Sequence, residues 1–116
     1  QRLVYRAMKS LVKKLKHIRD ILITCSDKVY HYDAPKGLQK YIVWAEDGEG
    51  NPLELDNNKL EQVITGTIDL FSKNEYDELI DKIQDALNKN CISFNLNSVQ
   101  YEDETGYIHY EWRFEI

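Results

Sequence analysis

Histidine and cysteine, the side chains most often used as metal ligands and nucleophiles, are few and widely separated in this chain. The histidines are His17, His31 and His109, and the cysteines are Cys25 and Cys91. No two of these residues have the spacing of a zinc-binding pair, and no local motif pairs a nucleophile with a histidine. The sequence therefore predicts no catalytic residue, no metal site and no cofactor, and it predicts structural or surface roles for the histidines.

Acidic residues form two clusters that are candidates for binding a divalent cation. Glu46, Asp47 and Glu49 follow an apolar segment, and residues 102–104 are all acidic. Paired carboxylates can hold Mg²⁺ for phosphodiester cleavage, but the lysine that such a nuclease usually places nearby is missing here. The segment 48–50 also lacks the remaining residues of a phosphate-binding loop. We predict solvated loop tips, with weak divalent binding without catalysis as the alternative.

Both cysteines are expected to be buried, reduced and structural. A small secreted domain that depends on disulfides usually carries more than two cysteines. Cys25 and Cys91 therefore indicate synthesis in a reducing cytoplasm. No apolar run approaches the roughly 20 residues that span a bilayer, and the charged N-terminal segment does not read as a signal peptide.

The net charge of -5 conceals a strong polarity along the chain. Residues 1–20 hold seven basic side chains and one acidic side chain, a net charge of +6, whereas residues 21–116 carry -11. The basic stripe has no interleaved aromatic residues, and the rest of the chain is acidic. A solvated or protein-docking surface is therefore favoured over a nucleic-acid or membrane surface, and the polarity favours copies that meet head to tail.

Two segments have the apolar spacing of amphipathic helices. The first is predicted from about Leu3 to Leu22, and the second from about Glu75 to Lys89 with Asn74 as its N-cap. The expected buried stripes are Val4, Met8, Leu11, Leu15, Ile18 and Leu22 in the first helix and Tyr76, Leu79, Ile80, Ile83 and Leu87 in the second.

Segments of alternating or β-branched residues predict the strands 29–32, 39–46, 61–72, 91–101 and 107–116. In the last strand Trp112, Phe114 and Ile116 are expected to point into the core. A change of phase predicts a β-bulge near residues 97–98, and Gly66 indicates a bulge or a close backbone approach. Residues 47–58 are predicted to be a loop and its connection.

The elements follow the order α-β-β-β-α-β-β, which predicts an α+β fold with two helices packed on one face of a largely antiparallel sheet. A chain of 116 residues can enclose one hydrophobic core, so we expect a single domain over residues 1–116. The hydrophobic content of 42% and charged content of 30% suit a folded domain.

Four segments carry a likeness to a known family: 29–32 followed by Ala34-Pro35, 41–48, 66–71, and the late hairpin 97–112. Through these segments the chain resembles the tail-terminator, or tail-completion, proteins of long-tailed phages and prophages of Gram-positive hosts. The likeness extends over most of the chain, and the order of elements is similar to that family's α-β-β-β-α-β plan.

The resemblance implies a structural protein of the virion and not an enzyme. Family members form a ring, usually a hexamer, at the head-proximal end of the tail tube, where the ring stops tube polymerisation and offers a surface for head docking. The implied partners are further copies of the chain, the tail-tube protein and the head-completion or connector protein. The implied location is the virion tail, after synthesis in the bacterial cytoplasm, with no membrane or direct nucleic-acid binding.

The polarity of charge suggests how copies meet in such a ring. The basic face of the first helix of one copy is expected to lie near the acidic segment of the next copy. The candidate interface residues are Arg6, Lys9, Lys13, Lys16, Glu46, Asp47 and Glu49. Charge reversal at Lys9 and Lys13 is expected to weaken assembly.

Three alternative functions stay open on the sequence alone. The first is a head-completion or other neck protein, which a tail-tube-binding assay separates from a terminator. The second is a small metal-dependent nucleic-acid enzyme, whose activity would be lost on substitution of Asp47 or Asp103. The third is a bacterial immunity or antitoxin-type binding protein, which would form no ring.

Overall fold

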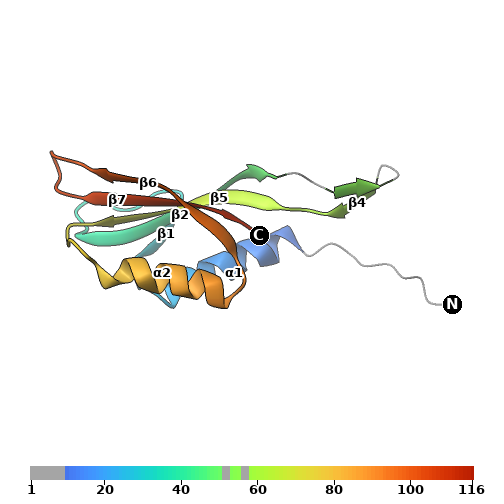
Figure 1. Cartoon of the computed structure of the whole chain (residues 1–116), viewed down its shortest axis with the longest axis horizontal. Helices are drawn as coiled ribbons and strands as arrows, with labels where there is room; N and C mark the ends of the chain where they lie inside the picture. The colour runs from blue at the N-terminus through green and yellow to red at the C-terminus, as the bar shows by residue number, and fades with distance from the viewer. Residues whose placement is uncertain (1–9, 51–52, 56–57) are drawn as a thin grey trace.

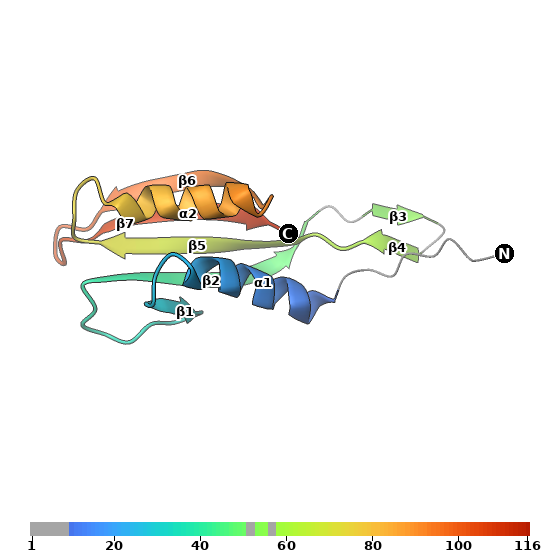
Figure 2. The same ribbon diagram turned by 90° about the horizontal axis from the view of Figure 1, so that it is seen from below.

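A five-stranded sheet with two helices on one face forms the main body of the protein (Figures 1 and 2). The structure is a computed structural model that describes residues 10–50, 53–55 and 58–116. The elements in chain order are α1 (Leu11–Ile23), β1 (Val29–His31), β2 (Lys40–Glu49), β3 (Leu53–Leu55), β4 (Asn58–Glu61), β5 (Ile64–Ser72), α2 (Glu78–Lys89), β6 (Ser93–Tyr101) and β7 (Ile108–Glu115).

The strand order in the large sheet is β1-β2-β5-β7-β6. The short edge strand β1 is parallel to β2, and the other three pairings are antiparallel. Strands β3 and β4 form a separate two-stranded hairpin that lies beyond the end of the large sheet (Figure 2). The predicted α+β fold, with its two helices on one face of a largely antiparallel sheet, is therefore confirmed.

The core lies between the helices and the covered face of the sheet. Side chains of β5 alternate strictly between buried and half-buried positions, as the period of two requires. Trp112 and Phe114 of β7 are both buried, and the Trp112 indole Nε1 donates a hydrogen bond to Gln84 Oε1 of α2 at 3.0 Å. The buried apolar residues of the core are Ile18, Ile21, Leu22, Ile42, Trp44, Ile68, Leu70, Leu79, Ile83, Leu87, Ile92, Trp112 and Phe114.

Helix α1 begins later than the apolar spacing predicts. Ser10 has an extended ψ of 132°, and its side chain accepts a hydrogen bond from the Lys13 amide, so Ser10 is the N-cap. Residues 1–9 lie outside the described residues. Leu11 is 41% exposed, contrary to the predicted stripe, because it lies in the first turn, where the helix extends past the sheet (Figure 2). Ile21 is buried in its place.

Helix α2 begins at Glu78, and its N-cap is Asp77 in place of the predicted Asn74. Asp77 Oδ1 accepts a hydrogen bond from the Leu79 amide at 2.9 Å, and Oδ2 accepts one from the Ser72 hydroxyl at 2.6 Å. Tyr76 therefore precedes the helix, has a φ of 59° and is 87% exposed, so its predicted place in the buried stripe is wrong.

The predicted loop at residues 47–58 is largely β-structure. Strand β2 continues to Glu49 by means of a β-bulge, because the pairing shifts by one residue between Glu46 and Gly48. The β3–β4 hairpin occupies the segment predicted to be a connection. The predicted bulge in β6 is confirmed by the register shift between Leu96 and Ser98.

The cysteines differ from each other in environment. Both thiols are free. Cys25 is half-buried against the core, where burial raises the pKa of its thiol, but Cys91 is exposed. Cys91 has a φ of 58° and follows α2, where its amide donates to the Asn88 carbonyl while the Ile92 amide donates to the Leu87 carbonyl. This left-handed turn ends the helix and places Cys91 outside the core, so the prediction of burial is wrong for Cys91.

Gly66 occupies a place in β5 where a larger residue does not fit, as the sequence predicted for a close approach. A Cβ atom there would lie 2.3 Å from the Ala45 carbonyl oxygen and 2.5 Å from Cζ of Phe114. We predict that Gly66→Ala lowers the free energy of unfolding by about 3 kcal/mol, because neither the backbone nor the buried ring can move away. Urea denaturation measures this change. Gly48→Ala is the control, since a Cβ at Gly48 meets nothing within 4 Å; equal losses in the two variants would contradict the prediction.

Asp77 makes the stability of the fold sensitive to acid. Burial disfavours its ionised form, but hydrogen bonds from Ser72, the Leu79 amide and Lys40 outweigh burial and lower the pKa of its carboxyl. A lowered pKa contributes stability above the unfolded value near 3.8, and this stability is lost as pH falls through the folded value. Asp77→Asn keeps a capping oxygen and removes the charge. We expect it to cost about 2 kcal/mol near neutral pH and progressively less as the pH falls below the unfolded value near 3.8 and through the folded value. A cost independent of pH in denaturant titrations would refute this account.

Candidate functional site

The face of the sheet opposite the helices carries a row of stacked rings across β2, β5 and β7. The Tyr41 and Phe71 rings stack with centroids 4.8 Å apart, and the Phe71 and His109 rings stack at 4.1 Å. Tyr107 meets both Tyr41 and Phe71 edge-on, and its hydroxyl donates to the Leu38 carbonyl. The row fixes the orientation of the His109 ring against the central strands of the sheet.

His109 lies between two carboxylates. Its Nε2 is 2.7 Å from Oδ1 of Asp69 on β5, and its Nδ1 is 3.8 Å from Oε2 of Glu102. The hydrogen bond to Asp69 raises the pKa of His109 above its usual value, against the opposing effect of burial. The charges of Glu102 and Glu111 act in the same direction as Asp69.

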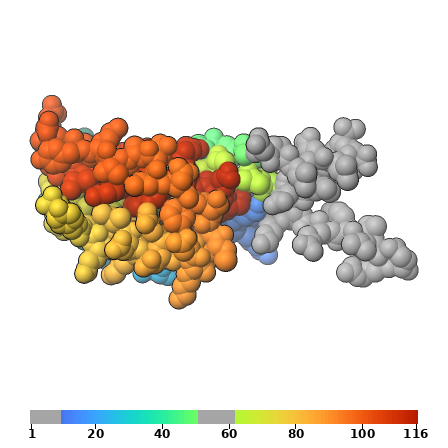
Figure 3. All heavy atoms as spheres, viewed as in Figure 1, coloured from blue at the N-terminus to red at the C-terminus, as the bar shows by residue number. Residues whose placement is uncertain are grey.

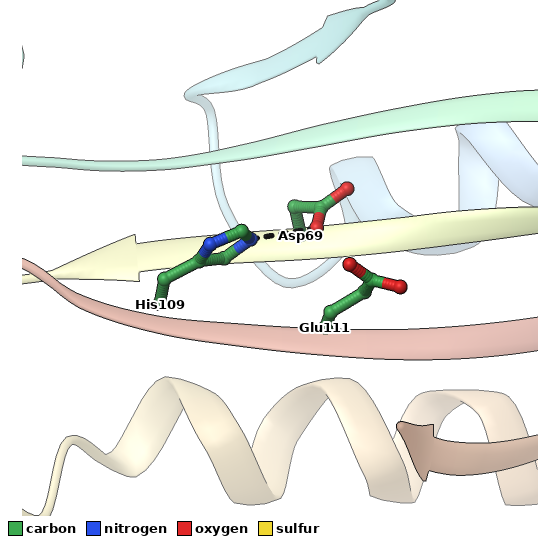
Figure 4. Close-up of side chains that lie close together, drawn as sticks. All are labelled: Asp69, His109 and Glu111. Atoms are coloured by element: carbon green, nitrogen blue, oxygen red, sulfur yellow. Dashed lines mark hydrogen bonds and ion pairs between the residues drawn. The ribbon is translucent and has the colours of Figure 1, made fainter. Parts of the chain in front are cut away.

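Asp69 and Glu111 are direct cross-strand partners in the β5–β7 pairing. Like charges that lie directly opposite each other on one face of a sheet are destabilising unless something lies between them. His109 is two residues before Glu111 on the same face, so one ligand atom from each of the three residues lies within 4.8 Å of the others (Figure 4). Imidazole and carboxylate groups in this arrangement could hold a metal ion.

A shallow hollow of about 330 Å³ borders this cluster. Its lining combines aromatic rings with acidic groups from the sheet and from the segment that follows β1. The lining residues are Tyr32, Asp33, Ala34, Tyr41, Val43, Asp69, Phe71 and His109. Solvent therefore reaches the cluster from the open face of the sheet.

A larger hollow of about 730 Å³ lies beside the start of α1. Its lining includes Lys13, Lys14 and His17 of α1 together with Cys91. The Lys14 ammonium donates to the carbonyls of Gln62 and Ile116, so this lysine joins α1 to the segments before β5 and after β7. Lys14 therefore has a structural role, which the sequence did not predict.

The basic members of the predicted interface lie on the surface as far as the structure describes them. Lys13 and Lys16 are exposed on α1, whereas Arg6 and Lys9 lie outside the described residues. The predicted contact of this face with acidic residues of another copy stays a prediction.

The acidic members of the predicted interface have different surroundings. Glu46 lies 2.7 Å from Nε2 of His31 and also accepts a hydrogen bond from the Tyr32 hydroxyl. Burial disfavours its ionised form, but the hydrogen bonds from Tyr32 and His31 outweigh burial and lower the pKa of Glu46. Glu49 is exposed at the end of β2.

Asp47 is the bulged residue of β2 and is engaged within the chain. It accepts hydrogen bonds from the Thr65 hydroxyl at 2.7 Å and from Nη2 of Arg113 at 3.0 Å. The Thr65 hydrogen bond lowers the pKa of Asp47, burial opposes this effect, and Arg113 adds to it. Thus Glu46 and Asp47 are ordered by intramolecular contacts and are not the solvated loop tips that the sequence predicted.

The cluster of Asp69, His109 and Glu111 was not predicted from the sequence. The alternation of the last strand correctly places His109 and Glu111 on its polar face, but the third member comes from β5. Only the pairing register, in which Asp69 is opposite Glu111, brings the three residues together. A His-x-Glu pattern on a strand was the only local signal for this site.

Neither the family models nor the curated proteins compared with this chain include a match. Within the described residues, no helix has the length and apolar character needed to cross a bilayer. The chemistry of the candidate site is therefore argued from its own geometry.

The opposed carboxylates give a test of this geometry in metal-free protein. We predict that Glu111→Gln raises the free energy of unfolding by about 0.5 kcal/mol in the presence of a chelator, because it removes the charge opposite Asp69. The glutamine oxygen can still accept the hydrogen bond that Asn97 Nδ2 now donates to Glu111. Denaturant titration measures the change. Glu115→Gln on the same strand face is the control, since Glu115 is opposite Thr65; a loss of stability in Glu111→Gln would contradict the prediction.

Proposed function

We propose that this protein is a structural subunit of a phage or prophage tail and that it acts through its interfaces, without enzymatic activity. Copies of the chain form a ring on the head-proximal end of the tail tube, with six subunits by analogy with the family that the sequence resembles. The ring stops tube polymerisation and offers the docking surface for the head connector. The partners are further copies, the tube protein and the head-completion protein.

The observation that carries the proposal is the β3–β4 hairpin. It lies between β2 and β5 in the chain and extends beyond both the large sheet and the helices (Figures 1 and 2). In the described part of the chain, β3 and β4 pair only with each other. A two-stranded hairpin is marginally stable in water unless it packs on other structure. An arm of this kind gains stability when it docks on a neighbouring subunit or on the tube.

The edge strand β6 gives a second reason to expect contacts between chains. Among the described residues it pairs with β7 alone, and its side chains form part of the surface seen in Figure 3, in orange. Three large apolar residues of β6 are exposed: Leu96 at 48%, Val99 at 49% and Tyr101 at 65%. An exposed edge strand with apolar side chains can pair with a strand of another chain. A ring provides each copy with such a neighbour.

The separation of basic and acidic residues along the chain would orient neighbouring copies relative to each other. Lys13 and Lys16 are exposed on α1 and are available to an acidic surface of the next copy. Glu46 and Asp47 already have partners within the chain, so new contacts would compete with those hydrogen bonds. We therefore give the hairpin and β6 the larger energetic role, and give charge the role of steering encounter and orientation.

We predict that replacing residues 51–61 by Asn-Gly, which together with Gln62 makes a three-residue loop, abolishes assembly without unfolding the main body. Gly50 and Val63 remain to close the shortened hairpin, since the Gly50 amide donates to the Val63 carbonyl at 2.8 Å. Native mass spectrometry is the measurement, with and without millimolar Mg²⁺ and with and without purified tail tubes. The intact chain is expected to give a closed ring alone or on the tube, and the shortened chain a monomer that does not bind tubes.

Shortening the β6–β7 turn at residues 103–105 is the control, because this turn lies at the opposite end of the sheet (Figure 1). This control variant is expected to assemble as the intact chain does. Circular dichroism and thermal unfolding show whether both variants keep the fold. An intact chain that forms no ring and binds no tube would overturn the proposal and favour a neck protein or a binding protein of another class.

A further inference from the structure

We propose that Asp69, His109 and Glu111 form a binding site for a divalent transition-metal ion, with Zn²⁺ as the best-matched ion. The site is independent of the ring proposal, because all three ligands belong to one chain. It lies on the open face of the sheet, on the two adjacent strands β5 and β7 (Figure 4).

The positions of the ligands suit one small cation. One ligand atom from each residue lies within 4.8 Å of the other two, and His109 Nε2 is 2.7 Å from Asp69 Oδ1. Zinc bonds to nitrogen and oxygen of about 2.0–2.2 Å require ligand atoms roughly 3.4 Å apart in a tetrahedral arrangement. Small rotations of the three side chains would therefore break the hydrogen bond between His109 and Asp69 and bring the three ligand atoms to bonding distance from one ion. The backbone of β5 and β7 would not have to move.

The second layer of contacts around the ligands resembles that of metal sites. Metal-binding histidines commonly direct their other ring nitrogen at a carboxylate. Here Nδ1 of His109 faces Glu102 at 3.8 Å, and the ring is stacked on Phe71. Asn97 Nδ2 donates to Oε2 of Glu111 at 3.0 Å, which leaves Oε1 for an ion. Two of the three ligands are thus oriented by neighbouring residues before any ion binds.

Electrostatics favours a cation at this position. Asp69 and Glu111 are direct cross-strand partners, and Glu102 adds a third carboxylate beyond the histidine. A divalent ion neutralises the opposed pair and replaces repulsion between β5 and β7 by a shared bond. The side chains of His109 and Asp69 are only 18% and 19% exposed, so the interaction is less screened than on an open surface.

The imidazole of His109 favours a transition-metal ion over Mg²⁺ or Ca²⁺ at this site. Mg²⁺ and Ca²⁺ prefer oxygen ligands, whereas zinc and its first-row neighbours accept imidazole together with carboxylate. Three protein ligands leave a fourth position, which a water molecule can fill from the hollow that Asp69 and His109 line. We expect binding with one ion per chain and an affinity in the micromolar range.

The test uses the full chain, dialysed against a chelator and then titrated with ZnCl₂ in a calorimeter. The expected result is one site per chain, weakened at least about tenfold in His109→Gln, in Asp69→Asn and in Glu111→Gln. Co²⁺ should give the intense visible absorption of a four-coordinate site in the intact chain and lose it in these variants. Zn²⁺ should also raise the unfolding temperature of the intact chain but not that of Glu111→Gln, which stays folded by its own denaturant curve.

His31→Gln is the matched control. His31 also faces a carboxylate at 2.7 Å, that of Glu46, but among the described residues it belongs to no group of three ligands. This variant should bind Zn²⁺ as the intact chain does. The proposal is overturned if Zn²⁺ does not bind at micromolar concentrations, if His31→Gln loses binding as His109→Gln does, or if Mg²⁺ binds as tightly as Zn²⁺.

Discussion

The close approach of three strands at Gly66 is the constraint on which the rest of the structure depends. Gly66 is opposite Glu46 of β2 and Phe114 of β7, and the space that a side chain would need is taken by the Ala45 carbonyl and the Phe114 ring. A slip of one residue in β5 would place a side chain in that space, and it would also turn every side chain of the strand to the other face. The glycine therefore fixes the register of the central strands as well as their distance.

That register places both the core and the candidate site. With Gly66 opposite Phe114, Ile68 is opposite Trp112 on the covered face, and Asp69 is opposite Glu111 on the open face. The β-bulges in β2 and β6 each shift the pairing register by one residue, between Glu46 and Gly48 in β2 and between Leu96 and Ser98 in β6. One alignment thus buries the large apolar residues and, as a consequence, brings two carboxylates together. The hydrogen bond between His109 and Asp69 compensates part of that cost.

Much of the fold could be predicted from local sequence patterns, and the predictions that were wrong have physical causes. The strands around Trp112 and Ile68 and the bulge near Ser98 were predicted because alternation is a local property. The cap of α2 was misassigned because Asn74 and Asp77 are both good capping residues, and contacts from outside the helix, from the Ser72 hydroxyl and the Lys40 ammonium, favour Asp77. The cluster of Asp69, His109 and Glu111 could not be predicted because Asp69 lies 40 residues before His109 and meets it only through strand pairing.

Two features of the surface favour binding partners of different kinds, a protein in one case and a small cation in the other. Among the described residues, β3 and β4 pair only with each other and three large apolar side chains of β6 are exposed, so another protein surface would suit both features. The cluster on β5 and β7 has an excess of negative charge at short range, which a protein surface compensates poorly but a small cation compensates well. Because β7 pairs with both β5 and β6, it is the element through which an ion at the cluster could affect the edge strand. An ion that holds β5 and β7 together would stiffen the strand on which β6 rests, without any contact between the ion and a neighbouring chain.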